Sequence, residues 1–343
     1  MTPTPDPAVP VHRRPRALFA MARHHRDALF PPAETRRLLA SVDIDPDHVS
    51  QDLCREPALE EAEILVTSWG CPVVDEEVLA RAPALKAIVH AAGSVKHHVT
   101  PACWERGIAV SSAAAANAVP VAEYTVAAIL FANKRVLDIG ALYRRHRAPL
   151  DWSRLYPGFG NHRRTVGVVG ASLVGRKVLE LLRPHDLDLL LSDPHVDPVQ
   201  AAGLGARLVE LDELVAASDV VSLHAPALPE TRHLLDARRL SLMRDGTTLV
   251  NTARGSLVDT EALTAQAVAG RLHAVIDVTE PEVLPTASPL YSLPNVLLTP
   301  HIAGSLGGEL LRISGSALDE VERYCSGRPF AHPVHHAALA TSA

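Results

Sequence analysis

The stretch TVGVVGASLVGRKVLELL, from Thr165 to Leu182, decides the fold that this chain is expected to adopt. A valine-rich run leads into Gly170, and a helical pattern of apolar residues begins after Ser172. Gly170 and Gly175 occupy the first and third positions of the Gly-x-Gly-x-x-Gly pattern, in which a strand, a tight turn and a helix N-terminus bind a pyrophosphate. Ser172 stands at the middle position, where that pattern has glycine.

Ser172 modifies this pattern and does not cancel it. The middle glycine lets the backbone approach the phosphate with no Cβ in between, and serine is small enough to keep most of that space. Asp193 ends the next predicted strand, where a carboxylate accepts the ribose hydroxyls of a dinucleotide. A plain strand–helix unit with Ser172 as its N-cap does not explain Asp193. The sequence therefore predicts NAD as the cofactor, since Asp193 would repel the 2′-phosphate of NADP.

Composition places the chain among globular proteins with more than one domain. Its 343 residues exceed what one core usually organises, and 47% hydrophobic with 21% charged residues is an ordinary balance for a folded protein. The net charge of -6 and the aromatic content of 4% argue against a nucleic-acid partner. The four cysteines have no zinc-ligand spacing, so we expect a reduced, cytoplasmic chain without a metal site.

No membrane segment is expected. The apolar run ALFAMA at 17–22 is too short for a signal-peptide core. The longest apolar segment, 113–133, contains Pro120 and Glu123, and we interpret it as a buried, alanine-rich helix. The region before Pro46 is rich in proline and arginine and shows only weak patterning.

Strands and helices are predicted to alternate along most of the chain, which indicates an α/β fold with parallel, doubly wound sheets. A long helix is predicted from Val119 to about Arg147, and a second alternating series begins at Thr165. The first series is expected to consist of strands at 62–69, 85–93 and 108–112, with a short helix capped by Asp75 and one helical turn, 100–107, closed by Gly107.

Polar side chains follow three predicted strands of the second series. Arg254 follows GTTLVN, the acids Asp277, Glu280 and Glu282 follow HAVI, and His301 follows NVLLTP. The carboxyl ends of parallel strands meet at the sheet edge where open α/β folds bind ligands. An arginine, an acid–base histidine and a carboxylate at that edge suit the binding and protonation of a small carboxylic acid.

Five segments together resemble the D-isomer-specific 2-hydroxyacid dehydrogenase family. They are VGVVGASLVG, SDVVSLHAPALPETRHLL, LMRDGTTLVNTARGSLVD, AVIDVTEPE and SPLYSLPNVLLTPHIAG, and the resemblance extends over about 64–304. It implies two Rossmann-like or flavodoxin-like domains, with the cofactor domain inserted into a discontinuous substrate domain. The implied NAD-binding domain is 113–303, and the implied substrate domain joins 1–112 to 304–343.

The resemblance also implies three catalytic residues. Arg254 corresponds to the arginine that binds the substrate carboxylate, and His301 corresponds to the acid–base residue. Glu282 corresponds to the carboxylate that holds the histidine ring and favours its charged form. Glu280 has no family role, and we interpret it as a surface charge.

The implied ligand contacts extend beyond these three residues. The amides of Gly93 and Ser94, together with Arg254 and His301, are the implied substrate contacts. Asp277 is implied to receive the nicotinamide carboxamide. The implied cofactor contacts are Gly170, Ser172, Leu173, Val174, Gly175, Asp193, His224, Ala225, Pro226, Thr231, Thr252, Ala253, Arg254, Asp277, His301 and Gly304.

The chain departs from the family pattern most in the segment HAAGSVKHHVT, 90–100. The family's substrate loop is close to Ala-Gly-Val-Gly-Val-Asp-Asn, whereas this chain has Lys96, His97 and His98. Thr279 and Val283 also stand where an aromatic residue and a proline are common. The substrate therefore does not follow from the family, and Lys96 indicates either an acid with a second anionic group or a solvated lysine.

Two functions of different classes fit these motifs. The first is an NAD-dependent D-2-hydroxyacid dehydrogenase, expected to be a homodimer that acts on a small 2-keto or 2-hydroxy acid. The second is an NAD(H)-sensing, corepressor-like binding protein of the same fold, which can keep the Arg–Glu–His set. Glu282 argues against a formate-oxidising enzyme, whose pattern has glutamine there. No peptide-binding or DNA-binding extension is visible in the sequence, which favours the enzyme.

Overall fold

A computed structural model describes residues 13–340 of the chain, which forms two compact units. Unit 1 consists of the described residues up to Ala113 together with Leu310–His336, and unit 2 contains Ala114–Glu309. The sequence predicts that the chain leaves the cofactor domain after residue 303. In the structure, unit 2 extends six residues further, to Glu309.

Unit 1 is built on a five-stranded parallel sheet with the order β2-β1-β3-β4-β5, which is the flavodoxin-like order. Its middle strands are buried on both faces, as expected where helices cover both sides of a parallel sheet. The strands are β1 Ala17–Ala20, β2 Val49–Ser50, β3 Ile64–Thr67, β4 Ala87–His90 and β5 Ala109–Ser112. The helices are α1 Arg23–Leu29, α2 Pro32–Ser41, α3 Glu76–Arg81, α4 Pro101–Glu105 and α13 Leu310–Cys325.

The weakly patterned region before Pro46 contains more structure than the sequence indicates. The run ALFA forms β1, a central strand whose last three residues are buried, and α1 and α2 follow it. A four-residue buried strand carries no periodicity that the sequence alone can show. The predicted cap of α3 is confirmed, since the Asp75 side chain accepts a hydrogen bond from the Val78 amide.

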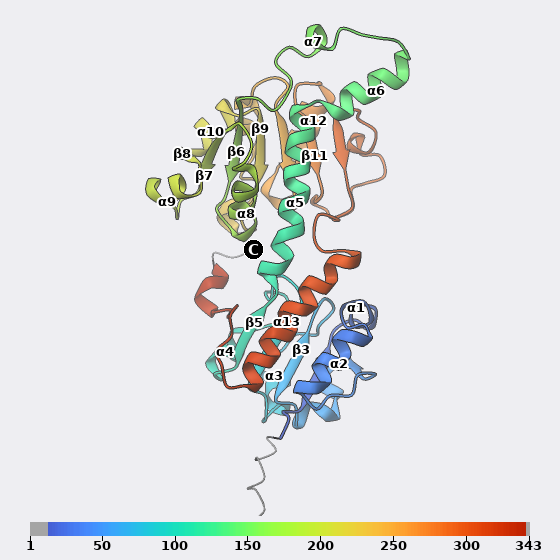
Figure 1. Cartoon of the computed structure of the whole chain (residues 1–343), viewed down its shortest axis with the longest axis vertical. Coiled ribbons are helices and arrows are strands. Elements are labelled where there is room, and N and C mark those ends of the chain that lie inside the picture. The colour runs from blue at the N-terminus through green and yellow to red at the C-terminus, as the bar shows by residue number, and fades with distance from the viewer. Residues whose placement is uncertain (1–12, 341–343) are drawn as a thin grey trace, which may run out of the picture. The chain divides into compact units, whose positions relative to one another are not determined.

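Unit 2 is built on a seven-stranded parallel sheet with the order β12-β11-β10-β9-β6-β7-β8 (Figure 1). The chain starts in the middle of this sheet and winds outward in both directions, as in a dinucleotide-binding fold. The strands are β6 Arg164–Val169, β7 Leu187–Ser192, β8 Arg207–Leu208, β9 Val220–Leu223, β10 Thr248–Asn251, β11 His273–Ile276 and β12 Val296–Leu298. The covering helices include α8 Leu173–Leu182, α9 Pro198–Gly203, α10 Leu211–Ala217, α11 Ala237–Leu242 and α12 Thr260–Val268.

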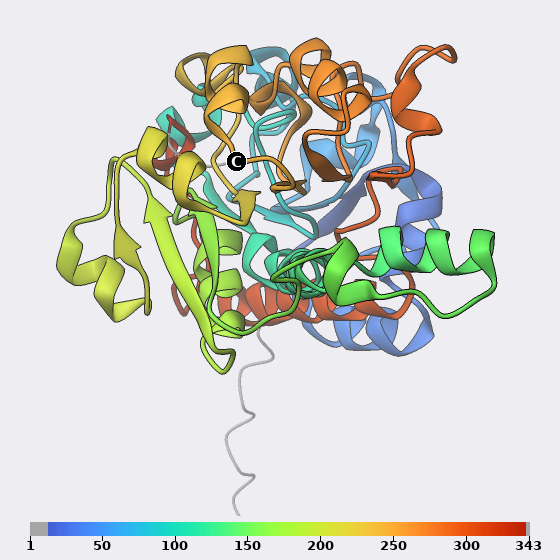
Figure 2. The ribbon, with the colours of Figure 1, turned by 90° about the horizontal axis from the view of Figure 1, so that it is seen from above.

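The long helix predicted from Val119 to Arg147 is two helices, so that prediction was wrong in detail. The first, α5, covers Ala114–Asn133 and packs along α8, and the second, α6, covers Val136–His146. They are separated at Arg135, which has a left-handed φ of 52°. Figure 2 shows α6 and the segment leading to α7, Trp152–Leu155, extending to one side of unit 2.

Among the described helices, α5 alone is long and apolar enough to cross a membrane by length and composition. Packing within unit 2 explains part of this composition, because Ala122 and Ile129 are fully buried in the core beneath it. Val166 on β6 and Val178 on α8 belong to the same core. Pro120 lies inside this helix.

The order of the unit 2 sheet reverses between β6 and β9, and this point locates its binding edge. All seven strands run parallel, so their carboxyl ends share one edge. Ligands of open α/β sheets bind at that edge, beside the reversal. The residues that follow these strand ends include Gly170, Asp193, His224, Arg254, Asp277 and His301.

Candidate active site

The glycine turn after β6 can accept only glycine at two of its positions. Gly170 has a φ of +95°, and a Cβ there would lie 2.7 Å from the Ala225 backbone nitrogen. A Cβ on Gly175 would lie 2.0 Å from the Gly170 carbonyl oxygen. The turn therefore packs directly against α8 and against the segment after β9, which places it at the reversal of the strand order.

Ser172 is the N-cap of α8. Its Oγ accepts a hydrogen bond from the Gly175 amide at 3.3 Å, and its φ of -66° is open to any residue. The capping role and the cofactor role are therefore compatible, because the amides of Leu173 and Val174 in the first turn have no acceptor inside the helix. Those two amides are the ones suited to a phosphate.

Asp193 lies against the glycine turn. Its Oδ2 accepts a hydrogen bond from the Ala171 amide at 2.6 Å, and its Oδ1 accepts one from the His195 amide at 2.8 Å. The carboxylate is therefore held beside the turn, at the end of the neighbouring strand. Together with the cradle around Gly170, this arrangement fits the ribose and pyrophosphate of a dinucleotide.

The segment after β9 is held by hydrogen bonds between its own residues and with the end of β9. His224 is 3% exposed, and its Nε2 lies 2.8 Å from the Ser222 Oγ, while its buried Nδ1 has no hydrogen-bond partner among the described residues. Burial lowers the pKa of His224 to about 3, so the ring is neutral. Thr231 donates to the Pro226 carbonyl at 2.6 Å and accepts from the Leu228 amide at 2.8 Å.

Asn251 holds the turn that carries Arg254. This buried residue ends β10, and its Nδ2 donates to the Arg254 carbonyl at 2.9 Å while its Oδ1 accepts from the Ala253 amide at 3.1 Å. Thr252 Oγ1, in the same turn, lies 2.9 Å from Thr125 Oγ1 on α5. Sequence reasoning missed Asn251, although an amide side chain at the end of a buried strand was a usable signal.

Arg254 is half-buried and carries few internal contacts. Its Nη1 donates to the Ala253 carbonyl at 2.7 Å. Burial lowers the pKa of Arg254, and the nearby Glu282 carboxylate opposes that shift. The guanidinium stays charged all the same, so its planar fork keeps donors for a carboxylate.

Close backbone contact brings the segment after β11 beside Arg254. A Cβ on Gly255 would lie 2.1 Å from the Thr279 carbonyl carbon and 2.5 Å from the Glu280 nitrogen. Glycine is therefore required next to Arg254 for this approach. The segment that passes here carries Glu282.

Asp277 orders the turn that carries His301. Its buried carboxylate accepts hydrogen bonds from Thr299 Oγ1 at 2.6 Å, from the Ile302 amide at 2.8 Å and from the Ala303 amide at 2.9 Å. Tyr124 of α5 lies 2.9 Å from the same Thr299 hydroxyl. The sequence predicts a cofactor contact for Asp277 and does not reveal this internal role.

His301 and Glu282 form a hydrogen-bonded pair at the exposed edge. The His301 Nδ1 lies 2.7 Å from Glu282 Oε1, and the two side chains are 52% and 62% exposed. His301 itself has a left-handed φ of 56°. Glu280 pairs with Arg232 instead, at 2.8 Å, so the geometry separates the two acids.

Three further predicted contacts are Gly304 in unit 2 and Gly93 and Ser94 in unit 1. Gly304 follows the His301 turn, and the next residue, Ser305, donates its amide to Asn117 Oδ1 at 3.1 Å. In unit 1, Gly93 and Ser94 are half-buried in the loop after β4. The Lys96 amide there donates to Ser94 Oγ at 3.4 Å.

A family description, D-isomer specific 2-hydroxyacid dehydrogenase, NAD binding domain, matches residues 126–303. The chain belongs to this family. The matched range includes every strand of unit 2 and the turns that carry Arg254 and His301. Unit 2 is therefore the NAD-binding domain of a D-isomer-specific 2-hydroxyacid dehydrogenase family member.

Relatives of this 2-hydroxyacid dehydrogenase family member differ in the substrate that their names state. A D-3-phosphoglycerate dehydrogenase of Mycobacterium bovis is 36% identical over 72% of this chain and 46% of its own length, so the chain spans about half of that relative. A glyoxylate reductase of Thermofilum pendens is 34% identical over 68% of this chain and 69% of its own. The structure of an Aquifex aeolicus D-lactate dehydrogenase with NAD and lactic acid is 29% identical, with a TM-score of 0.69 over 91% of this chain and 96% of that one.

Proposed function

We propose that this chain is an NAD-dependent D-2-hydroxyacid dehydrogenase that interconverts a 2-keto acid and a 2-hydroxy acid. The observation that carries the proposal is the His301–Glu282 pair at 2.7 Å, on the same sheet edge as Arg254 and the glycine turn. NAD, when bound, supplies or accepts the hydride. A corepressor-like binding protein can keep the same residues, so turnover of a keto acid is what separates the two functions.

The two sides of the His301 ring have different tasks in this proposal. Its Nδ1 is engaged by Glu282, so Nε2 is the atom that gives a proton to the keto oxygen during reduction and takes it back during oxidation. The Glu282 carboxylate stabilises the charged ring and fixes its orientation. Arg254 grips the substrate carboxylate with two parallel hydrogen bonds, and the amides of Gly93 and Ser94 are further candidates for carboxylate binding.

Steady consumption of NADH with a panel of 2-keto acids tests this function. We expect turnover with at least one acid, and we expect NADH to be preferred over NADPH because of Asp193. The competing proposal is the NAD(H)-sensing, corepressor-like protein. NADH binding without turnover of any acid would favour that alternative and contradict the dehydrogenase.

We propose that the substrate carries a second anionic group. Lys96 stands in the loop after β4 where the family has an acidic residue, and this exchange of sign supports an additional anion. Kinetics with 3-phosphohydroxypyruvate, glyoxylate and pyruvate test the point. The Lys96→Ala variant should lose efficiency with the phosphorylated acid alone, and an equal loss with all three would contradict it.

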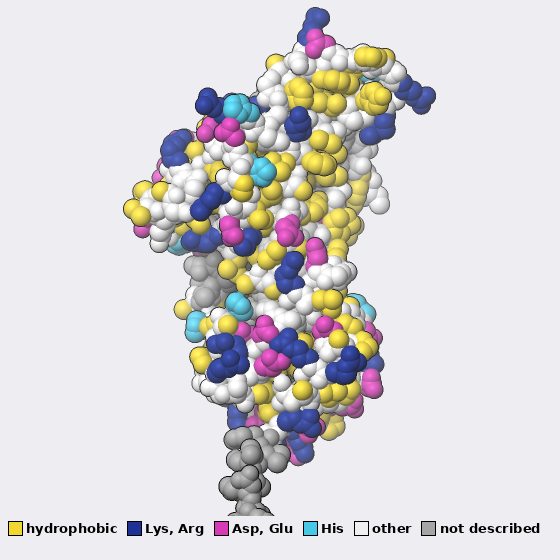
Figure 3. All heavy atoms as spheres, viewed as in Figure 1, with side chains coloured by type: hydrophobic (Ala, Val, Ile, Leu, Met, Phe, Trp, Pro, Cys, Tyr) yellow, Lys and Arg dark blue, Asp and Glu magenta, His cyan; other side chains and the backbone are white. Residues whose placement is uncertain are grey.

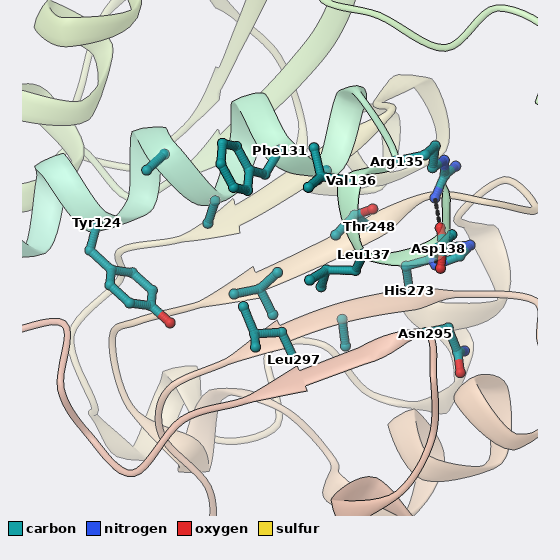
Figure 4. A pocket seen from close by; sticks show the side chains of 15 residues that line it. Tyr124, Phe131, Arg135, Val136, Leu137, Asp138, Thr248, His273, Asn295 and Leu297 are labelled. Carbon is teal, nitrogen blue, oxygen red and sulfur yellow. Dashed lines mark ion pairs between the residues drawn. The ribbon is translucent and has the colours of Figure 1, made fainter. Parts of the chain in front are cut away.

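We also propose that the protein is a homodimer, and that it is cytoplasmic. An apolar groove of about 180 Å³ lies between α5, α6 and the strands β10 to β12, and Tyr124 is among the residues that line it. Figure 4 shows Phe131, Val136, Leu137 and Leu297 around it, and hydrophobic side chains gather over α5 and α6 in Figure 3. A second copy is the occupant that we favour for this groove.

The helix α6 supports a second copy as the occupant. None of its eleven residues is buried, and an isolated helix of this length is marginal in water. Phe131 and Tyr143, exposed by 58% and 59%, extend the apolar surface from the groove onto α6. Light scattering should give a dimer for the natural chain and a monomer for Phe131→Glu, and a monomer in both would contradict the proposal.

A further inference from the structure

The segment 329–336, which follows α13 and which we call the strap, lies along the edge strand of the unit 1 sheet. β5 is the last strand in the order of that sheet, so one side of it has no neighbouring strand of the sheet. The strap runs antiparallel to β5, with Pro333 opposite Ser111. Figure 1 shows this red segment beside β5 and α4. The strap therefore takes the place of one more strand.

Two backbone hydrogen bonds join the strap to β5. The Val334 amide donates to the Val110 carbonyl at 2.7 Å, and the Ser112 amide donates to the His332 carbonyl at 3.4 Å. In an antiparallel ladder every second residue bonds the partner strand, and the residues between them point their N–H and C=O groups the other way. His332 and Val334 therefore face β5 with their backbones, and Pro333 faces away from it.

Side chains of α4 and α13 hold the strap as well. The Trp104 indole N–H donates to the Val334 carbonyl at 2.9 Å, and the Trp104 ring stacks on His336 with 5.3 Å between the ring centroids. On α13, the Glu320 carboxylate accepts a hydrogen bond from the Ala331 amide at 3.0 and 3.1 Å to its two oxygens, and Glu320 is 1% exposed. The strap is thus bonded to three separate elements of unit 1.

The strap itself buries little apolar surface. Its residues are exposed or half-buried, whereas Val110 and Ser111 of β5 are buried. Burial of apolar surface is the largest source of stability, so a segment held by hydrogen bonds and a ring contact opens at a lower free energy than the core of its unit. Its opening leaves the Val110 carbonyl and the Ser112 amide unpaired at a sheet edge, which is a template for a strand of another molecule.

Pro333 gives the strap an outer side that does not continue the sheet. Its backbone faces away from β5, where any other residue would offer an N–H to a further strand. Proline has no N–H, and within sheets it is confined to edges for that reason. The strap therefore covers one edge without creating an equivalent edge.

We propose that the strap ends the unit 1 sheet: it pairs with β5 and, through Pro333, prevents a second copy of the chain from adding a strand. This role goes beyond the dehydrogenase activity and does not depend on it, since none of the proposed catalytic residues takes part. It is also separate from the dimer proposed above, because α5 and α6 belong to unit 2.

Two prolines placed at neighbouring residues test the pairing with β5. Val334→Pro removes the amide that bonds Val110, so hydrogen exchange of the amides over 108–113 should quicken by about tenfold. His335→Pro is the matched control, since His335 faces away from β5 in the alternation of the ladder and its proline removes no bond to that strand. If the two variants exchange alike over 108–113, β5 does not hold the strap and the proposal is overturned.

Pro333→Val tests the outer side of the strap. It introduces an outward N–H while the strap stays paired, so the variant should associate as its concentration rises, which sedimentation velocity measures. His332→Val is the matched control, because it adds an apolar side chain of the same kind and no new donor. Every chain in this test also carries Phe131→Glu, which removes the association proposed for unit 2. If Pro333→Val sediments as the control does, the proline does not end the sheet, and the proposal fails.

Hydrogen exchange on the strap separates strand pairing from unspecific aggregation. In Pro333→Val, exchange over 329–336 should slow as the concentration rises, because a further strand then protects these amides. Association with unchanged exchange there would contradict the proposal. Val334→Pro should associate through the opened β5 edge, and if it opens and stays monomeric, that edge needs no cover and the proposal is wrong. Neither readout uses turnover, so the failure of the dehydrogenase assay would leave this test intact.

Discussion

The carboxyl edges of the two sheets order their loops with different buried groups. In unit 2, the amide of Asn251 and the carboxylate of Asp277 each bind the backbone of the following turn. In unit 1, the buried imidazoles of His90 and His98 share the Thr67 hydroxyl beneath the loop after β4. Unit 2 therefore keeps the groups that hold its turns apart from its exposed histidine, His301, whereas unit 1 buries two histidines, which burial keeps neutral.

The largest effect that sharpens this comparison is expected at His301, the exposed histidine of unit 2. His301→Ala should lower kcat/KM by about 10³-fold or more at every pH, because the proposed function assigns the proton transfer to His301. NADH should still bind, since the glycine turn is untouched. Kinetics and fluorescence titration of NADH measure the two properties, and lost NADH affinity would mean that the variant disturbs the fold of the edge.

Acid should destabilise the protein through the buried histidines. The pKa of His98 is about 4 and that of His224 is about 3, whereas both are near 6.5 in the unfolded chain. Above about pH 6.5 the two histidines are neutral in both states. As the pH falls from about 6.5 toward the folded pKa, protons bind the unfolded chain first, and the free energy of unfolding decreases. Each should remove about 1.4 kcal/mol of unfolding free energy per pH unit below pH 6.5.

Urea unfolding between pH 7 and pH 5 checks this expectation. His98→Gln should show a shallower fall of stability than the natural chain, and the exposed His195→Gln should show the same fall as the natural chain. If both variants follow the natural profile, His98 takes up its proton without unfolding, and unit 1 tolerates charge beneath its loop.

A smaller effect is expected when the Glu282 charge is removed. Glu282→Gln keeps the shape but no longer stabilises the charged ring of His301, so activity in the reduction direction should decline at a lower pH. Activity near pH 6 should survive much better than at pH 8. The pH profile of kcat/KM measures this, with Glu280→Gln as the control because Glu280 pairs with Arg232. If the pH profile shifts in Glu280→Gln and not in Glu282→Gln, then Glu280 is the partner of His301 and Glu282 is not.

The smallest effect is expected at Ser172. Ser172→Gly should change NADH affinity only a few-fold, since the backbone there needs no glycine and glycine is a tolerable N-cap. Ser172→Leu should abolish binding, because its side chain would occupy the pyrophosphate approach. Fluorescence titration with NADH separates the two variants, and tight binding by the leucine variant would show that this turn does not hold the cofactor.

The sequence by itself determined the architecture of unit 2 and the residues of its edge. Gly170, Gly175 and Asp193 were recognisable because a tight turn and a ribose contact restrict which residues can serve, and their spacing is local. Arg254, Glu282 and His301 were recognisable because each directly follows, or lies close behind, a strand. Local spacing also accounts for the confirmed cap at Asp75. The break at Arg135 was missed, since its backbone conformation leaves no signal in an otherwise helical pattern.

Only the tertiary structure decided which polar groups meet. The sequence assigns Glu282 to the histidine only through the family resemblance, and the folded segment after β11 places Glu280 beside Arg232 and Glu282 beside His301. Thr67 and His90 are far apart along the chain and become partners only through the register of β3 and β4. Hydrogen bonds depend on distances of about 3 Å, and residues distant in sequence reach such distances only when strands pair and loops close.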